Sequence, residues 1–299
     1  RTKKYQKTVI HSIGIKNGKM DYKGVGEVPG NVLNQFSMDE KNGYLRIATT
    51  TGETWRGTSL NHLYVLNNKL DVVGSVEDLA TGERIYSVRF IDDRAYMVTF
   101  RQVDPLYVIE LKDPENPKVL GFLKVTGYSD YLHPFDENHI VGVGMDASEE
   151  GRVQGVKIAL FDVSDVNNPQ EISRFKIGDE IKNSWSSTTV SYDHKSFLFD
   201  KEKSLMVLPI SYNLQNGDQW EYWQGAFVFS IDLNKIDLRG KISHFETNKS
   251  YGDEVRRSLY IDNILYTISY YKVIASELSS LEKIKSIEFE NVWERTDVY

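Results

Sequence analysis

The sequence predicts an all-β fold built from repeated four-stranded antiparallel units. Strand-length segments rich in Val, Ile, Tyr and Phe, broken by Asp, Asn and Gly, fill almost the whole chain. A helical period is found only in the short SELSSLEKIK at 276–285. PLYVIELKDPENPKVLGFLKV at 105–125 and KIALFDVSDVNNPQEISRFKI at 157–177 share their length and their order of apolar run, acidic turn, Asn-Pro and apolar run. The chain is therefore repetitive.

Each unit begins with a hairpin around an acidic turn. Asp, Asn and Gly are the residues that a tight reversal accepts, and each of these hairpins has two apolar arms around one aspartate. The five hairpins span 36–49, 90–100, 133–144, 197–210 and 259–270, around Asp39, Asp92, Asp136, Asp200 and Asp262.

A second apolar pair follows each hairpin, and the last, at 272–289, is the weakest. Four strands in about 40–50 residues, with insertions in loops, are typical of the radially arranged blades of a β-propeller. The predicted blades span approximately 32–77, 84–125, 128–177, 190–245 and 255–290. We therefore expect residues 1–299 to form one propeller domain or a fragment of one.

Residues 8–26 resemble a further outer strand pair that lacks its inner pair. The chain thus holds about five complete blades and one incomplete blade, and we interpret it as part of a larger ring. An open sheet edge favours association. The missing strands would come from upstream sequence, from the C-terminal NVWERTDVY or from another chain.

Composition excludes several classes of protein. The chain has 299 residues, 40% hydrophobic and 26% charged, which is typical of a soluble globular protein. Its net charge of −7 is spread along the chain, so we expect no nucleic-acid partner. No apolar run predicts a membrane span, and the absence of cysteine excludes disulfides and a Cys nucleophile. RTKKYQK precedes no apolar signal region and there is no initial Met, so we expect a cleaved precursor or an excised fragment.

The phrases GEVPGNVLNQFSMDEKNGYLRIATTTG (26–52), ERIYSVRFIDDRAYMVTFRQVDPLYVI (83–109) and GYSDYLHPFDENHIVGVGMDA (127–147) resemble a known family. So do YDHKSFLFDKEK (192–203) and RRSLYIDNILYTIS (256–269). The family comprises secreted archaeal and bacterial proteins with a C-terminal β-propeller domain distantly related to WD-repeat propellers. The resemblance implies an extracellular or cell-surface location and offers no catalytic residues. Members continue upstream with strand-rich sequence that this chain lacks.

Four long excursions, at 49–61, 145–156, 178–193 and 211–225, are expected as loops on one face of the propeller. Aromatic side chains with a polar rim are typical of interface hot spots and ligand clefts, although rings also pack long loops against a scaffold. Both interpretations remain open. Four of the five tryptophans fall in these excursions: Trp55, Trp185, Trp220 and Trp223.

The first strand of each blade lines the channel of a propeller, and polar residues gather near its start. Converging charges there can bind a polar ligand or shift pKa values toward catalysis, whereas water and inter-blade ion pairs are the simpler interpretation. The candidates are Arg89, His133, Asp193, His194 and Arg257.

No cofactor is assigned. His133, His139 and Asp136 have zinc-ligand chemistry, but the expected hairpin register separates the two histidines. The oxygen-rich segments 146–152 and 217–222 are candidates for a structural calcium, without the spacing of a known calcium loop. Ser191 lies near Asp193 and His194 without a nucleophile elbow, so a surface hydroxyl is the better interpretation.

These observations favour a non-enzymatic, extracytoplasmic module that presents a Trp-rich face to a protein or glycan at the cell envelope. The alternative is a hydrolase or lyase that acts in the channel mouth. It requires the five channel residues to converge on one cavity. A third alternative is a structural module that serves a fused partner domain.

Overall fold

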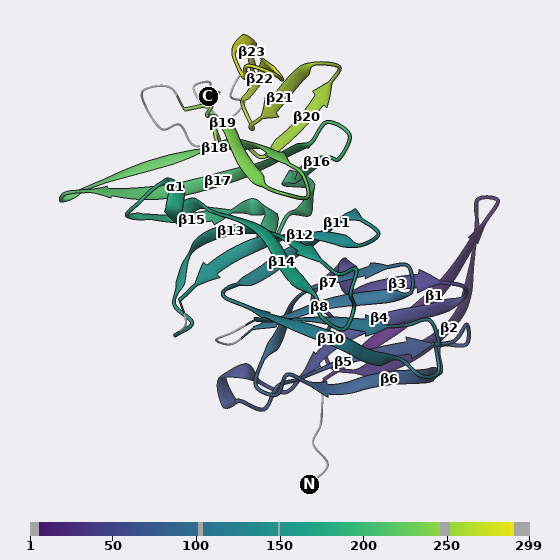
Figure 1. Cartoon of the computed structure of the whole chain (residues 1–299). Coiled ribbons are helices and arrows are strands. Elements are labelled where there is room, and N and C mark those ends of the chain that lie inside the picture. The colour runs from purple at the N-terminus through teal and green to yellow at the C-terminus, as the bar shows by residue number, and fades with distance from the viewer. Residues whose placement is uncertain (1–5, 101–103, 149, 246–251, 290–299) are drawn as a thin grey trace, which may run out of the picture. The chain divides into compact units, whose positions relative to one another are not determined.

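A computed structural model describes residues 6–100, 104–148, 150–245 and 252–289 of the chain (Figure 1). In this part, the regular structure is almost entirely β, with one four-residue α-helix, α1 (Ile177–Glu180). The all-β prediction is confirmed. The chain divides into two compact units, and residues 143–146, 154–160 and 172–299 make up the second.

The first unit contains a two-stranded sheet and two four-stranded antiparallel sheets, with orders β1-β2, β3-β4-β5-β6 and β10-β9-β8-β7. The strands are β1 (Lys7–Lys16), β2 (Lys19–Pro29), β3 (Met38–Lys41), β4 (Tyr44–Thr51), β5 (Leu60–Leu66), β6 (Val72–Leu79), β7 (Arg84–Ile91), β8 (Arg94–Phe100), β9 (Asp104–Glu110) and β10 (Lys118–Val125). The 3-10 helices η1 (Gln35–Ser37) and η2 (Thr54–Arg56) belong to the same unit.

A third four-stranded sheet has residues in both units and the order β11-β12-β13-β14. Its strands are β11 (Tyr128–Asp136), β12 (His139–Ala147), β13 (Val153–Asp162) and β14 (Gln170–Lys176).

The second unit contains two further sheets. In the first of them, β15 and β16 both pair with β17, followed by β18 and β19, and the second has the order β20-β21-β22-β23. The strands are β15 (Ser184–Thr188), β16 (Leu198–Asp200), β17 (Leu205–Asn216), β18 (Gln219–Ile231), β19 (Ile236–Ile242), β20 (Arg257–Ile261), β21 (Ile264–Ile268), β22 (Lys272–Glu277) and β23 (Lys283–Glu288).

The inner strand of the β15–β19 sheet is split by two 3-10 helices, η3 (Thr189–Ser191) and η4 (His194–Ser196). Side chains cap both helices: Thr188 accepts from the Val190 N–H and Asp193 from the Lys195 N–H. These local bonds compete with the ladder to β17, so pairing stops after Thr188 and resumes at Leu198.

The helical period at 276–285 does not form a helix. It spans the end of β22, a turn and the start of β23. Ser279 and Ser280 donate to the Glu277 carboxylate, and Leu281 has a positive φ of 62°. Local side-chain bonds therefore stabilise a turn where the apolar spacing suggested a helix.

Glycines in outer strands allow the next sheet to pack closely. A Cβ at Gly74 in β6 would clash with Pro114 and Pro117, in the turn between β9 and β10. In the same way, Gly121 in β10 packs against residues 166–167, and Gly240 in β19 against Leu281. The repeated acidic and Asn-Pro turns therefore contact the preceding outer strand, where only glycine leaves room.

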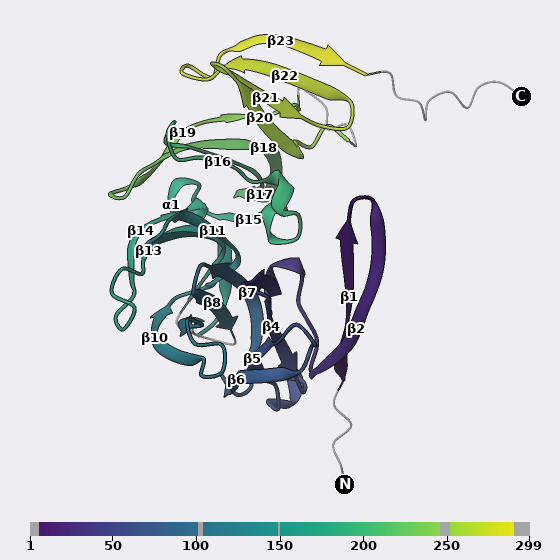
Figure 2. The ribbon, with the colours of Figure 1, turned by 90° about the vertical axis from the view of Figure 1, so that its right-hand side faces the viewer.

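The two-stranded sheet follows the same rule, because Gly26 in β2 packs against Leu70 in the turn between β5 and β6. Ile10 and Val28 also contact a buried cluster that includes Ile47 and Tyr64. Figure 2 shows β1 and β2 beside the β3–β6 sheet. This hairpin thus occupies the position of an outer strand pair.

Candidate functional site

The long β17–β18 hairpin carries aromatic side chains on one face, and it extends well past β19 (Figure 1). Trp185 in β15 pairs with Asn213 in β17, which pairs with Tyr222 in β18. Paired residues share a face of the sheet, and residues two apart along a strand also share it. Trp185, Tyr222 and Trp220 therefore lie on the same face.

Polar side chains separate these rings. Ser187 and Ser211 are on the same face and their hydroxyl oxygens lie 2.8 Å apart. Asn213 and Gln215 follow along β17 with the same alternation. We define the aromatic face as Trp185, Ser187, Ser211, Asn213, Gln215, Trp220 and Tyr222. It combines exposed rings, with Trp185 47% and Trp220 64% exposed, with hydrogen-bonding groups between them.

Trp223 lies on the opposite face of the hairpin. Its ring stacks on Tyr212 with centroids 5.3 Å apart and meets the edge of Phe227 at the same distance. The Lys241 ammonium lies 5.9 Å from the Trp223 ring centroid. Trp223 therefore packs the hairpin against β19 and is separated from the other two tryptophans of this sheet.

A pocket of about 430 Å³ lies beside Trp185 in the second unit. Asp146 and Lys176 form an ion pair of 2.9 Å at its wall, with the Asp146 side chain 6% exposed. The Asp146 Oδ1 atom is buried and makes no hydrogen bond within the described part of the chain. The remaining polar lining comes from Gln154, Asp179, Asn183 and Ser184.

The expectation that the tryptophans occupy loops is wrong for Trp185, Trp220 and Trp223, which lie on β15 and β18. The excursion at 211–225 is a continuation of two strands that turn at Gly217, which has a φ of 61°. Gly217-Asp218 is a signal for a two-residue hairpin turn with glycine at its first position, and it predicts the observed pairing of Asn216 with Gln219. Asp146 and Lys176 had no such signal, because their contact depends on the packing of separate strands.

Trp55 belongs to the first unit, in η2, and is 74% exposed. The Arg56 guanidinium lies 4.3 Å from the centroid of its ring, and Arg56 also pairs with Glu53 at 3.0 Å. Trp55 is therefore on a turn, as expected for this residue, and it is partly covered by its neighbour.

In the first unit, the structure brings Arg89 and His133 together through Tyr131. Arg89 Nε donates to the Leu132 carbonyl at 2.8 Å, and its guanidinium lies 4.0 Å from the Phe36 ring centroid and 5.2 Å from that of Tyr131. The Tyr131 hydroxyl is 3.1 Å from His133 Nδ1. Burial, and then the charge of Arg89, lowers the pKa of His133 to about 4, so this imidazole is neutral at pH 7.

In the second unit, Arg257 Nη2 donates to Asp193 Oδ2 at 2.7 Å. Burial acts to raise the pKa of Asp193, but the hydrogen bond and charge of Arg257 outweigh it and hold that pKa below its usual range. His194 follows in η4. The five channel candidates are thus divided between the units, two in the first and three in the second.

The metal hypotheses gain no support from the geometry. His139 Nδ1 lies 2.7 Å from Asp136 Oδ1, whereas His133 contacts Tyr131. Among residues 6–100, 104–148, 150–245 and 252–289, no group of three His, Asp or Glu side chains is arranged to hold a metal ion. Within the suggested calcium segment 146–152, Asp146 is paired with Lys176.

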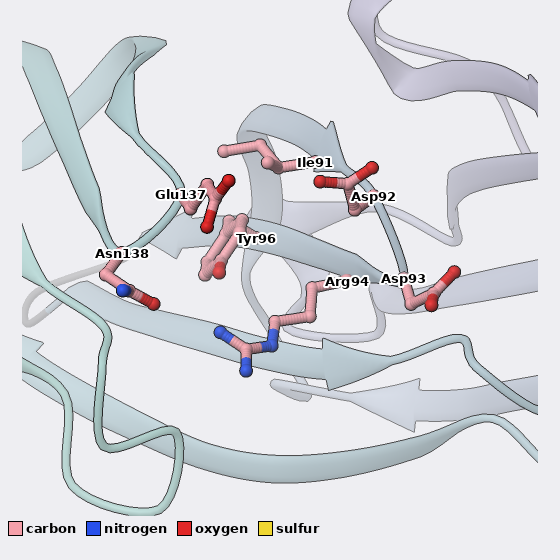
Figure 3. Close-up of a pocket in the computed structure, with 7 residues that line it drawn as sticks. All are labelled: Ile91, Asp92, Asp93, Arg94, Tyr96, Glu137 and Asn138. Atoms are coloured by element: carbon pink, nitrogen blue, oxygen red, sulfur yellow. The ribbon is translucent and has the colours of Figure 1, made fainter.

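A second pocket, of about 240 Å³, lies in the first unit at two hairpin turns (Figure 3). It is lined by Ile91, Asp92, Asp93, Arg94, Tyr96, Glu137 and Asn138. Reasoning from sequence identified none of these as site residues, because each turn is an ordinary acidic reversal by itself.

Comparison with known proteins identifies related sequences. The family described as "Beta propeller domain" matches residues 1–281. An uncharacterised protein of Methanocaldococcus jannaschii is 43% identical over 267 residues, which are 89% of this chain and 38% of that protein. An uncharacterised protein of Archaeoglobus fulgidus is 38% identical over 273 residues, which are 91% of this chain and 38% of that protein. The chain therefore spans well under half the length of these relatives.

Among solved structures, the periplasmic gluconolactonase PpgL of Pseudomonas aeruginosa is similar with a TM-score of 0.40 and 10% identity, over 88% of this chain and 87% of that one. This likeness is too weak to support any inference about activity. The described helices include none with the length and hydropathy that a membrane crossing requires.

Proposed function

Because the chain belongs to the beta propeller domain family, we propose that it is a non-enzymatic binding module whose aromatic face binds a glycan of the cell envelope. The observation that carries this proposal is the alternation of exposed rings and hydrogen-bonding side chains on a regular sheet. A rigid β scaffold keeps such groups in place before the ligand arrives, which lowers the entropic cost of binding.

The chemistry of the aromatic face favours a glycan over a protein. The face of an indole ring carries negative partial charge, and the C–H groups of a sugar ring present a flat positive surface to it. Sugar hydroxyls need partners when they lose water, and Ser187, Ser211 and Asn213 supply donors and acceptors between the rings. A protein hot spot would instead favour a continuous apolar centre with a polar rim.

The pocket beside Trp185 extends this surface with a cavity. Its ion pair and side-chain amides are suited to the terminal residue of an oligosaccharide. The envelope location is proposed from the resemblance to secreted proteins. The hydrolase or lyase alternative has less support, because Asp193 is already paired with Arg257.

Tryptophan substitutions test the proposal. In a glycan array of envelope-type oligosaccharides followed by calorimetry, Trp185→Ala and Trp220→Ala are each expected to weaken binding about fivefold or more, since each removes about 1 kcal/mol or more of ring contact. Because both side chains are largely exposed, the unfolding temperature is expected to change little.

Trp223→Ala is the matched control, because Trp223 lies on β18 with Trp220 and its ring is on the opposite face of the sheet. It is expected to lower the unfolding temperature and leave glycan affinity within about twofold when measured below that temperature. If envelope peptides bind and glycans do not, the partner is a protein. If Trp185→Ala and Trp220→Ala bind every ligand as the wild type does, the aromatic face is not the site.

A further inference from the structure

The pocket in Figure 3 lies where a contact between neighbouring sheets is missing. At the preceding junction, cations of the β3–β4 hairpin hold the turn between β7 and β8. Arg46 Nη1 donates to the Asp92 carbonyl at 2.6 Å, and Lys41 Nζ lies 2.9 Å from Asp93 Oδ1. Two positive side chains thus bind one acidic turn.

The equivalent positions of the next hairpin are not cationic. Arg46 is the third residue of β4, and the third residue of β8 is Tyr96. Lys41 ends β3, and Ile91 ends β7. The next turn, Glu137-Asn138, is therefore opposite a phenol and an aliphatic side chain, and a pocket of about 240 Å³ remains between them.

Tyr96 is fully buried, and its hydroxyl makes no hydrogen bond of normal geometry within the described residues. A buried hydroxyl without a partner costs about 1–3 kcal/mol of stability. Burial raises the pKa of Tyr96 and outweighs the close polar contact and the charge of Arg94, which lower it, so the hydroxyl is protonated and can donate at pH 7. A ligand that accepts a hydrogen bond would remove this penalty.

The pocket contains charges of both signs. The described residues provide no ion-pair partner within 4.0 Å for either Arg94 or Glu137. In the view of Figure 3, the Arg94 guanidinium and the Asn138 carboxamide lie toward the hydroxyl end of Tyr96, and the Glu137 carboxylate lies toward its other end. Donors and an acceptor are therefore separated across a small cavity.

We infer that this pocket binds a small zwitterion of the α-amino acid class. The ligand carboxylate accepts hydrogen bonds from Arg94 and the Tyr96 hydroxyl, and its ammonium group interacts with Glu137. A guanidinium is well shaped for a carboxylate. Asp92 and Asp93 are already paired with Lys41, so a simple anion would leave Glu137 without a counter-ion and a simple cation would leave Arg94 without one.

Three probes of similar size separate the charge requirements. L-alanine carries both charges, propionate only the negative one and ethylamine only the positive one. In calorimetry or NMR titration of the whole chain, L-alanine is expected to bind at least about tenfold more tightly than either of the others. Equal binding of propionate and L-alanine would show an anion site and contradict the inference. The absence of L-alanine binding at concentrations up to about 10 mM would also overturn it, because even a ligand of this size should bind detectably there.

Variants test the residues. Tyr96→Phe removes only the buried hydroxyl, so it is expected to weaken L-alanine binding about fivefold or more while the unfolding temperature stays the same or rises. Arg94→Gln is expected to abolish detectable binding, and Glu137→Gln to remove the preference for L-alanine over propionate. Arg84→Gln, an exposed cation on the adjacent β7, is the control and should bind as the wild type does. Wild-type affinity in Tyr96→Phe and Arg94→Gln would refute the site, whatever the outcome of the glycan experiments.

Discussion

His244 makes the stability of the second unit depend on pH. Its side chain is buried, with the residue 1% exposed, and Nε2 lies 2.8 Å from the Thr267 hydroxyl. Burial, and then the charges of Lys272 and Lys283, lowers the pKa of His244 to about 4. The folded state therefore resists protonation that the unfolded chain accepts near pH 6.5.

The free energy of unfolding is expected to fall as pH decreases from about 6.5 to about 4, because the unfolded state binds the proton first. The loss due to His244 amounts to about 3 kcal/mol from the difference between the two pKa values. Urea unfolding between pH 7 and pH 4 measures it. His244→Gln should flatten this dependence; an identical slope in the variant would assign the effect to other groups, such as His133 in the first unit.

At the scale of elements, Gln224 in β18 joins its strand to the segment that precedes β20. Its Nε2 donates to the Val255 carbonyl at 2.8 Å, and its Oε1 accepts from the Val255 N–H at the same distance. Both residues are buried. The Gln224 carboxamide thus satisfies both the N–H and the carbonyl of Val255, which lies outside the strands.

Gln224→Ala is expected to reduce the free energy of unfolding by about 2–4 kcal/mol, because it leaves a buried N–H and a buried carbonyl without partners. Denaturant unfolding monitored by circular dichroism checks this. Gln215 on the neighbouring β17 is exposed, so Gln215→Ala serves as the comparison. Equal stability of the two variants would mean that water replaces the lost bonds.

The hairpins show which features a sequence can specify. Each of the five acidic turns, such as Asp92 and Asp262, lies at a hairpin of the structure, because turn chemistry depends on a few adjacent residues. The faces of Trp220 and Trp223 depend on register, which the Gly217-Asp218 turn determines locally. The 240 Å³ pocket was beyond prediction, since it depends on how the turn at Glu137 meets a different hairpin.

At the scale of the whole molecule, β1 has one pairing edge without a strand among the described residues. Val9, Ile13 and Ile15 are on one face of this strand, and each is more than half exposed. A blade normally continues inward from this position, which agrees with the expectation of an incomplete blade. An open apolar edge favours pairing with another chain.

The purified chain is therefore expected to self-associate through β1 in sedimentation experiments at micromolar concentration. A double variant with Ile13→Lys and Ile15→Lys should sediment as a smaller species, because the charges oppose strand addition. Val72→Lys on the outer strand β6 is the comparison. If all three proteins sediment as monomers at the highest concentration, the edge is not an association surface for a second copy.

The glycine contacts have an evolutionary consequence. The sheet of β7–β10 contributes a turn that rests on Gly74 and a glycine, Gly121, that receives the next turn. Each such repeat carries both contact surfaces, the turn and the glycine. It can therefore be duplicated or lost without a change in the surface of either neighbouring repeat. Lineages of such proteins can then change the number of repeats by recombination, and the length of the repeat array becomes a property that selection can adjust in whole steps.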